Sequence, residues 1–328
     1  MRIINNRISY FDFLRGLAIM MVVGIHTYTL GEDSIEVRQL LNAAVPLFIA
    51  ISGYFLSQKK MENKEDYFSF LKKQLPKVYL PVLVWSLPLY ALAIYSGSSI
   101  FLQTILLFGC GLSIYYFVAF IMQCYVVLPV INSSVSGNKR RGGVIAGCLI
   151  SLVWIAGVEY IKTIQGKGIP LILYAGPLPC WLMFFVLGVL IGQKSERTYS
   201  IILPAVVTIT GFALSVMESN YLLEHYGKGF GVKPSSFFYS AGMVFLMFSN
   251  KMENLFSRTG IIYRFIIWLG SLSFGIYLIH CYFVSFFVKR LPIDSWLMEW
   301  VFSIFLTVVF ILILQKLLPS KFHKYFGI

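Results

Sequence analysis

The chain has 328 residues, of which 58% are hydrophobic and only 12% are charged, and its mean hydropathy is +0.77. A typical soluble domain has about 25% charged residues, so this composition excludes an ordinary soluble fold. The net charge of +13 would suggest nucleic-acid binding in a soluble protein, but in a membrane protein it belongs to the loops between spans. We therefore predict an all-α, polytopic transmembrane helix bundle whose partner is the lipid bilayer, with no nucleic acid.

Apolar stretches long enough to cross a bilayer recur along the whole chain, and about ten spans are predicted because each requires about 20 residues. They lie at 9–30, 39–58, 77–96, 113–133, 142–161, 174–193, 199–217, 236–250, 265–288 and 296–316. A further apolar segment at 99–109 is too short to span and is predicted to be interfacial or re-entrant. No linker divides the chain, so residues 1–328 are predicted to form one membrane domain.

The basic residues predict the orientation of this bundle. With the N-terminus inside, 19 of the 27 lysines and arginines fall in cytoplasmic segments and seven in outer segments, while Arg15 lies within the first span. An excess of Lys and Arg in cytoplasmic loops is the rule for membrane proteins. We therefore predict a multi-pass membrane protein whose termini are both cytoplasmic.

Two polar segments and the cysteines complete the pattern. Residues 59–76 are rich in lysine and lead to a proline, which predicts an interfacial helix on the cytoplasmic side. Residues 218–235 contain three glycines among charged residues, which is typical of a flexible loop, here on the outer side. The five cysteines have no CxxC or metal-like spacing, so we predict packing roles and no metal site.

The first span contains three polar residues that a helix would place on one face. Around a helix, Asp12, Arg15 and His26 all fall within about 60° of one another, and His26 lies about 21 Å along the axis from Asp12. A charged residue within a span costs roughly 2.5–3.5 kcal/mol on insertion scales and usually marks function. His26 suits general-base chemistry because imidazole titrates near neutral pH. Two simpler interpretations stay open: His26 could bond a nearby carbonyl, and Asp12 and Arg15 could merely neutralise each other.

Further candidates lie in later segments. Ser273, Tyr277 and His280 share one helix face, either as substrate contacts or as a packing ladder, and Ser52 lies in a span that a proline could kink to open a cavity. Three lysines flank the third span on the cytoplasmic side and could hold the phosphates of a soluble donor, anchor anionic lipid or orient the span. They are Lys72, Lys73 and Lys77.

Together these motifs closely resemble the acyltransferase-3 family of membrane acyltransferases, across most of the chain and in the expected order. The motifs are Arg7-x4-Asp12-x2-Arg15-Gly16-x-Ala18 followed by His26, Pro46-Leu-Phe through Ser52-Gly53-Tyr54, the basic stretch before Tyr79-Leu-Pro81 and Trp85, Tyr115-Tyr116-Phe117, and Ser273-Phe-Gly-Ile-Tyr277-Leu-Ile-His280. The opening motif and the short length look most like bacterial surface-polysaccharide O-acetyltransferases, including the enterobacterial common antigen type.

The resemblance implies transfer of an acyl group, usually acetyl, from cytoplasmic acyl-CoA to a hydroxyl of a glycan or lipid-linked sugar. It implies catalytic roles for His26, Asp12 and Arg15, and we assign substrate contacts to Ser52, Tyr277 and His280 and cofactor binding to the three lysines. Two departures matter. The family often has arginines where this chain has the lysines, which lack the bidentate fork, and its frequent Trp-Phe pair is Tyr116-Phe117 here.

A second class of function fits the same composition. In a polytopic transporter or glycan flippase, the intramembrane Asp12, Arg15 and His26 would form an ion or proton relay. A non-catalytic membrane sensor is a third class, but no large extramembrane segment is predicted for it. The acceptor, the length of the acyl group, the choice between direct transfer and an acyl-histidine intermediate, and the oligomeric state are left open.

Overall fold

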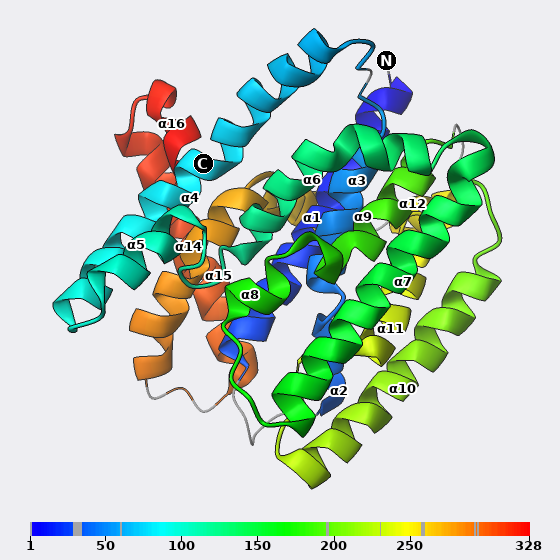
Figure 1. The fold of residues 1–328 in the computed structure, drawn as a ribbon. Coiled ribbons are helices and arrows are strands. Elements are labelled where there is room, and N and C mark those ends of the chain that lie inside the picture. Colours follow the sequence, from blue (N-terminus) through cyan, green and yellow to red (C-terminus); the bar gives the residue numbers. More distant parts are fainter. Residues whose placement is uncertain are drawn as a thin grey trace.

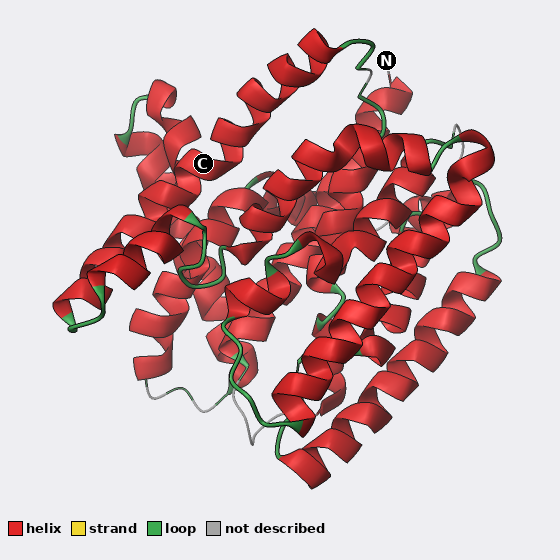
Figure 2. Cartoon of the chain, in the orientation of Figure 1, coloured by secondary structure: helices red, strands yellow, loops and turns green. Residues whose placement is uncertain are grey.

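The computed structural model describes residues 2–28, 35–59, 61–194, 197–229, 231–256, 260–291, 293 and 295–328, with side chains from residue 9 onward. Within these ranges the chain forms helices and loops and contains no strand, as Figure 2 shows. The prediction of an all-α fold is confirmed. The side chain of Arg7, which begins the first motif, lies outside the described part.

The α-helices are numbered in chain order, and Figure 1 labels most of them. Their bounds are α1 (Arg2–Thr27), α2 (Ile35–Leu41), α3 (Ala44–Leu56), α4 (Lys64–Tyr95), α5 (Ile100–Phe108), α6 (Tyr116–Ser134), α7 (Arg140–Glu159), α8 (Leu171–Ala175), α9 (Leu178–Gly192), α10 (Ile202–Tyr226), α11 (Pro234–Met247), α12 (Asn250–Phe256), α13 (Ile261–Ser271), α14 (Ser273–Phe286), α15 (Trp296–Leu317) and α16 (Ser320–Phe326). Short 3-10 helices cover Gly137–Lys139 and Val288–Arg290, and a π-helical turn at Tyr160–Ile164 extends α7.

Seven helices of the described chain are long and apolar enough to cross a membrane. An eighth span is present if α13 and α14, which are bent by 79° at the break between them, count as one. The remaining two predicted spans coincide with α9 and α11, which have only 15 and 14 residues. The chain is a multi-pass membrane protein, but the predicted count of ten and the orientation of the termini stay predictions.

The centre of the bundle is formed by α1, α3 and α9, with α4 and α5 on one side and α7 and α10 on the other (Figure 1). Most of α9 is buried, as expected for a helix that is apolar on every side. Glycines bring α13 against α1: a Cβ on Gly16 would lie 2.0 Å from the Ile266 carbonyl oxygen, and one on Gly270 would lie 1.8 Å from that of Asp12. This close approach fixes the start of the α1 polar stripe.

The structure confirms a helix in the first polar segment but not its separation from the third span, and it contradicts a uniform loop in the second. The interfacial helix at 59–76 and the third span are one continuous helix, α4, which begins where the Asn63 side chain accepts a hydrogen bond from the Asp66 amide at 2.7 Å. Its prolines are tolerated because membrane helices can satisfy the freed carbonyls elsewhere. The segment at 218–235 is not a uniform loop, since α10 continues to Tyr226 and Lys233 is fully buried.

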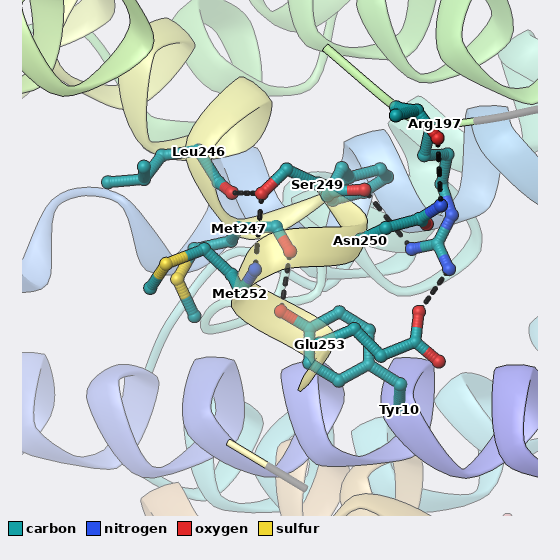
Figure 3. Close-up of polar contacts among 10 residues, drawn as sticks. Tyr10, Arg197, Leu246, Met247, Ser249, Asn250, Met252 and Glu253 are labelled. Atoms are coloured by element: carbon teal, nitrogen blue, oxygen red, sulfur yellow. Dashed lines mark hydrogen bonds and ion pairs between the residues drawn. The ribbon is translucent and has the colours of Figure 1, made fainter. Parts of the chain in front are cut away.

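A buried cluster around Arg197 ties the segment after α9 to α1, α11 and α12 (Figure 3). The Arg197 guanidinium donates to the Phe248 carbonyl at 3.1 Å and forms an ion pair with Glu253. It also lies within 6.0 Å of the ring centroids of three aromatic residues. They are Tyr10, Phe11 and Tyr54. Arg197 is therefore an interior anchor and not the exposed loop charge that the sequence predicts.

Candidate active site

A cavity of about 450 Å³ lies beside α1 and is also lined by parts of α2, α3, α6, α8 and α14. This volume is within the usual range for small-molecule sites, about 300–1,000 Å³. Most of the lining is apolar or aromatic, and the polar groups are few. They are Arg15, Arg38, His26, Asn42, Ser52, Tyr116, Tyr125, Tyr174, Ser273 and Tyr277.

The α1 stripe extends along this cavity. Arg15 and His26 both line it, and their spacing in one helix separates them by about 17 Å along the axis. Arg15 donates to Asp12 at 2.6 Å, and its guanidinium lies 5.2 Å from the centroid of the Phe55 ring. Asp12 does not line the cavity. Asp12 and Arg15 therefore do form the ion pair that the simpler interpretation of these residues predicts. Arg15 nevertheless also lines the cavity.

His26 is paired with the second intramembrane histidine. The ring centroids of His26 and His280 are 5.3 Å apart, although the two residues come from the first and the fourteenth helix. His280 is completely buried, does not line the cavity, and has Nδ1 2.8 Å from the Ile276 carbonyl oxygen. The structure therefore places His280 behind His26, where it can orient His26 but has no direct exposure to the cavity.

The other predicted substrate contacts lie in the cavity wall. The Ser52 hydroxyl donates to the Phe48 carbonyl at 3.0 Å, and the Tyr277 hydroxyl donates to the Ile114 carbonyl at 2.7 Å. Tyr277 also packs edge-on against Phe117, with ring centroids 5.6 Å apart. Both hydroxyls thus have a protein partner, and their oxygens can still accept a hydrogen bond from a ligand.

The three predicted phosphate ligands are not part of this cavity. Lys72, Lys73 and Lys77 are exposed on α4 and are absent from the cavity lining, whereas the next residue, Val78, is in it. The lysines therefore flank the cavity on one of its walls, and their role in binding CoA stays a prediction.

One cavity residue, Arg38, was missed at the sequence level and counted only as a charge of an outer segment. Its guanidinium donates to the Ile25 carbonyl at 3.0 Å and lies 5.8 Å from the centroid of the Tyr28 ring. It therefore places a cation directly beside His26. The only hint in the sequence is that Arg38 stands at the start of an apolar run. Arginines at such positions often serve only to orient a membrane span, so this hint does not indicate a functional site.

Comparison with known proteins decides the family. A family model described as an acyltransferase domain, of the acyltransferase-3 type, matches residues 8–316. The chain belongs to the acyltransferase-3 family. It is also 24% identical over 283 residues to YfiQ of Bacillus subtilis (strain 168), a protein with a provisional assignment as a membrane-bound acyltransferase. That match covers 81% of this chain and 75% of the relative, and no solved structure matches.

The chain is thus a membrane acyltransferase, which favours an enzyme over a transporter or a sensor. The narrower likeness to the enterobacterial common antigen type is not confirmed by these comparisons. In this acyltransferase, the cavity brings together Arg15 and His26 of α1 and Arg38 of α2.

A buried lysine supports another part of the wall of this cavity. Lys233 donates to the carbonyls of Gly229 at 2.9 Å and Gly231 at 3.2 Å, and to the Gln39 side chain at 3.1 Å. Gly231 and its neighbour Val232 line the cavity. Burial lowers the pKa of Lys233 to about 8, and two nearby carboxylates oppose this effect. They are Glu159 and Glu218.

Proposed function

We propose that this protein transfers an acetyl or other short acyl group from cytoplasmic acyl-CoA to a hydroxyl of an extracytoplasmic or lipid-linked glycan. The observation that carries the proposal is one cavity in a family acyltransferase that is lined by both Arg15 and His26. Arg15 and His26 lie about 17 Å apart along α1. This separation suits an acyl donor that is bound near Arg15 and an acceptor hydroxyl that is activated near His26, within the membrane.

In the proposed reaction, His26 is the general base. Its imidazole takes the proton of the acceptor hydroxyl as the hydroxyl oxygen attacks the carbonyl carbon of the thioester. The carbon–sulfur bond then breaks, and the imidazolium returns the proton to the leaving thiolate of CoA. General base catalysis of this kind contributes about 10²–10⁴-fold to a rate. An acyl-histidine intermediate is the two-step alternative, in which His26 is acylated first.

Arg38 supplies the positive charge that this attack requires. Negative charge develops on the thioester carbonyl oxygen as the hydroxyl adds, and a pre-positioned donor in a site shielded from water stabilises it. Arg38 is held beside His26 by its bond to the Ile25 carbonyl, and it lines the same cavity. We therefore assign it to the oxyanion.

The donor and the acceptor enter from opposite ends in this proposal. Arg15, held by Asp12, contacts the pantetheine or phosphate part of the donor, and Lys72, Lys73 and Lys77 hold the nucleotide at the cytoplasmic surface. Ser52 and Tyr277 contact the substrates from the cavity wall, and His280 orients His26. This arrangement requires cytoplasmic termini and suits a bacterial inner-membrane enzyme that modifies surface polysaccharide, such as the enterobacterial common antigen type.

The test is transfer by the purified full chain in detergent. We expect release of free CoA thiol from acetyl-CoA, and a mass increase of one acetyl group on surface glycans from cells that express the gene. His26→Ala should lower thiol release at least 10²-fold, because the base is lost. The matched control is His225→Ala, which removes an exposed histidine of α10 and should leave the rate unchanged.

Normal transfer by the inserted His26→Ala protein would contradict the proposal. Activity that requires an ion gradient and consumes no acetyl-CoA would instead favour the transporter alternative.

A further inference from the structure

A cluster of metal-ligating groups lies in the wall of the cavity, between α1 and α14. His26, His280 and Cys281 each bring one ligand atom to it, and these atoms all lie within 4.8 Å of one another. Within the cluster, Cys281 Sγ is 3.5 Å from His280 Nε2. Spacing along the chain could not predict this cluster, because its members come from opposite ends of the sequence and meet only when α14 packs against α1.

The hydrogen bonding of His280 prepares it for coordination. With its Nδ1–H donated to the Ile276 carbonyl at 2.8 Å, the lone pair resides on Nε2, which is the nitrogen nearest the thiol. Metal-bound histidines almost always donate their other ring N–H in this way, since the bond fixes the tautomer and the ring orientation. The ring is fully buried and is therefore held in place.

The ligand types select the metal. Two imidazoles and one thiol suit zinc, whereas magnesium and calcium require oxygen ligands, and no carboxylate belongs to the described cluster. Zinc bonds of about 2.0–2.3 Å place tetrahedral ligand atoms about 3.3–3.6 Å apart. The 3.5 Å separation of Cys281 and His280 already meets this condition, and the ligand atom of His26 lies within 4.8 Å of both. Among the three described ligands, His26 is the one that lines the cavity.

We propose that His26, His280 and Cys281 form a binding site for Zn²⁺ and that zinc bound there reversibly inhibits acyl transfer. Binding displaces one proton, that of the Cys281 thiol, and engages the lone pair with which His26 would accept the acceptor proton. The binding half of this proposal stands alone, and the inhibitory half rests on the proposed role of His26.

The binding half is tested with the purified full chain after chelation, by titration with Co²⁺ as the spectroscopic probe. We expect saturation at one equivalent, with a thiolate-to-cobalt charge-transfer absorption that Zn²⁺ abolishes. Cys281→Ser should lose this absorption, and Cys148→Ser, which changes a partly exposed cysteine on α7, should keep it. Absence of the absorption in the unaltered protein, or its persistence in Cys281→Ser, would overturn the site.

A second measurement needs no variant and so does not depend on how a variant folds. Zn²⁺ should slow maleimide alkylation of Cys281 in the unaltered protein at least tenfold, measured on the Cys281 peptide by mass spectrometry. Alkylation of Cys148 in the same sample is the internal control and should not change. Equal alkylation of Cys281 with and without zinc would contradict the proposal.

The inhibitory half is tested by thiol release from acetyl-CoA. Zinc should suppress it and a chelator should restore it, and Cys281→Ser should require at least tenfold more zinc for the same inhibition relative to its own zinc-free rate. Zinc binding without inhibition would refute regulation, whereas binding by a protein that releases no thiol under any condition would refute the proposed function and leave the metal site intact.

Discussion

Arg15 and Arg197 both form ion pairs with a carboxylate, but they do so in opposite surroundings. Arg15 binds Asp12 one turn earlier in the same helix, and the two side chains are 34% and 22% exposed. Arg197 binds Glu253 across the fold (Figure 3). These two side chains are only 5% and 18% exposed. The first pair borders the cavity, and the second is enclosed by aromatic rings.

The difference separates structural from chemical use of the same side chain. The Arg197 guanidinium is surrounded by a carboxylate, a carbonyl and three aromatic rings of the protein itself. Its contacts therefore stabilise the fold. Arg15 has one hydrogen-bonded partner, Asp12, among the described residues and keeps further N–H groups for a ligand. The presence of a charged residue is therefore not enough to identify a functional site. The contacts that the charged group already makes within the protein show whether it can still bind a ligand.

The largest expected effect follows from breaking the buried pair. Arg197→Ala should lower the free energy of unfolding by about 3–5 kcal/mol, because it leaves the Glu253 carboxylate uncompensated in the interior. Thermal unfolding in detergent would show this loss, with Lys194→Ala as the control at an exposed position of the same segment. A melting temperature equal to that of the unaltered protein would contradict the assignment of Arg197 as an anchor.

Removal of the cation beside His26 should instead affect the reaction. Arg38→Ala is expected to lower kcat about 10²–10³-fold, as loss of an oxyanion donor does in other acyl-transfer enzymes. The rate of CoA thiol release at saturating acetyl-CoA measures this. Arg38→Lys keeps the charge and should recover part of the rate, so a lysine variant as inactive as the alanine variant would favour a purely structural role for the arginine fork.

Much of this molecule could be predicted from sequence where one helix contains the whole pattern. The stripe of Asp12, Arg15 and His26 depends only on the helical period, and it does lie on one helix, with Arg15 and His26 at one cavity. The apolar runs likewise mark helices in the right order, because an apolar run must bury its backbone polar groups in a helix within a membrane. Only their lengths, and hence the number of complete spans, depend on the packed structure.

What the sequence could not predict depends on contacts between segments. Arg38 and Cys281 lie near His26 only because α2 and α14 pack against α1. Arg197 and Lys233 were counted as loop charges, since the charge of a residue does not indicate whether a distant carboxylate or carbonyl encloses it. The continuous α4 was missed because proline marks a helix boundary in soluble proteins more often than in membranes.

The exposed pair should behave differently from the buried one when it is broken. Arg15→Ala is expected to change stability by less than about 1 kcal/mol, as partly exposed ion pairs contribute little. Its effect should fall on the donor, with a rise of about 10–100-fold in KM for acetyl-CoA, which corresponds to one lost charge-assisted hydrogen bond. Steady-state kinetics and a melting curve on the same preparation measure both quantities. A stability loss as large as that of Arg197→Ala would remove the contrast between the two arginines.

Lys233 offers the most gradual test, because it is a buried cation whose proton can be removed. Its pKa is lowered from an ordinary value of 10.5 to about 8 by burial, against the attraction of Glu159 and Glu218 and with added repulsion from Arg38. Between these two values the unfolded chain binds more protons than the folded chain, so folding becomes more favourable as pH rises, by at most about 1.4 kcal/mol per pH unit. The comparison is with Lys233→Met, which cannot titrate at this position: the melting temperature of the unaltered protein relative to this variant should rise from pH 8 toward pH 10.5. A difference independent of pH would mean that Lys233 keeps its charge in the interior, as the arginines do, and that its hydrogen bonds to the Gly229 and Gly231 carbonyls compensate for burial.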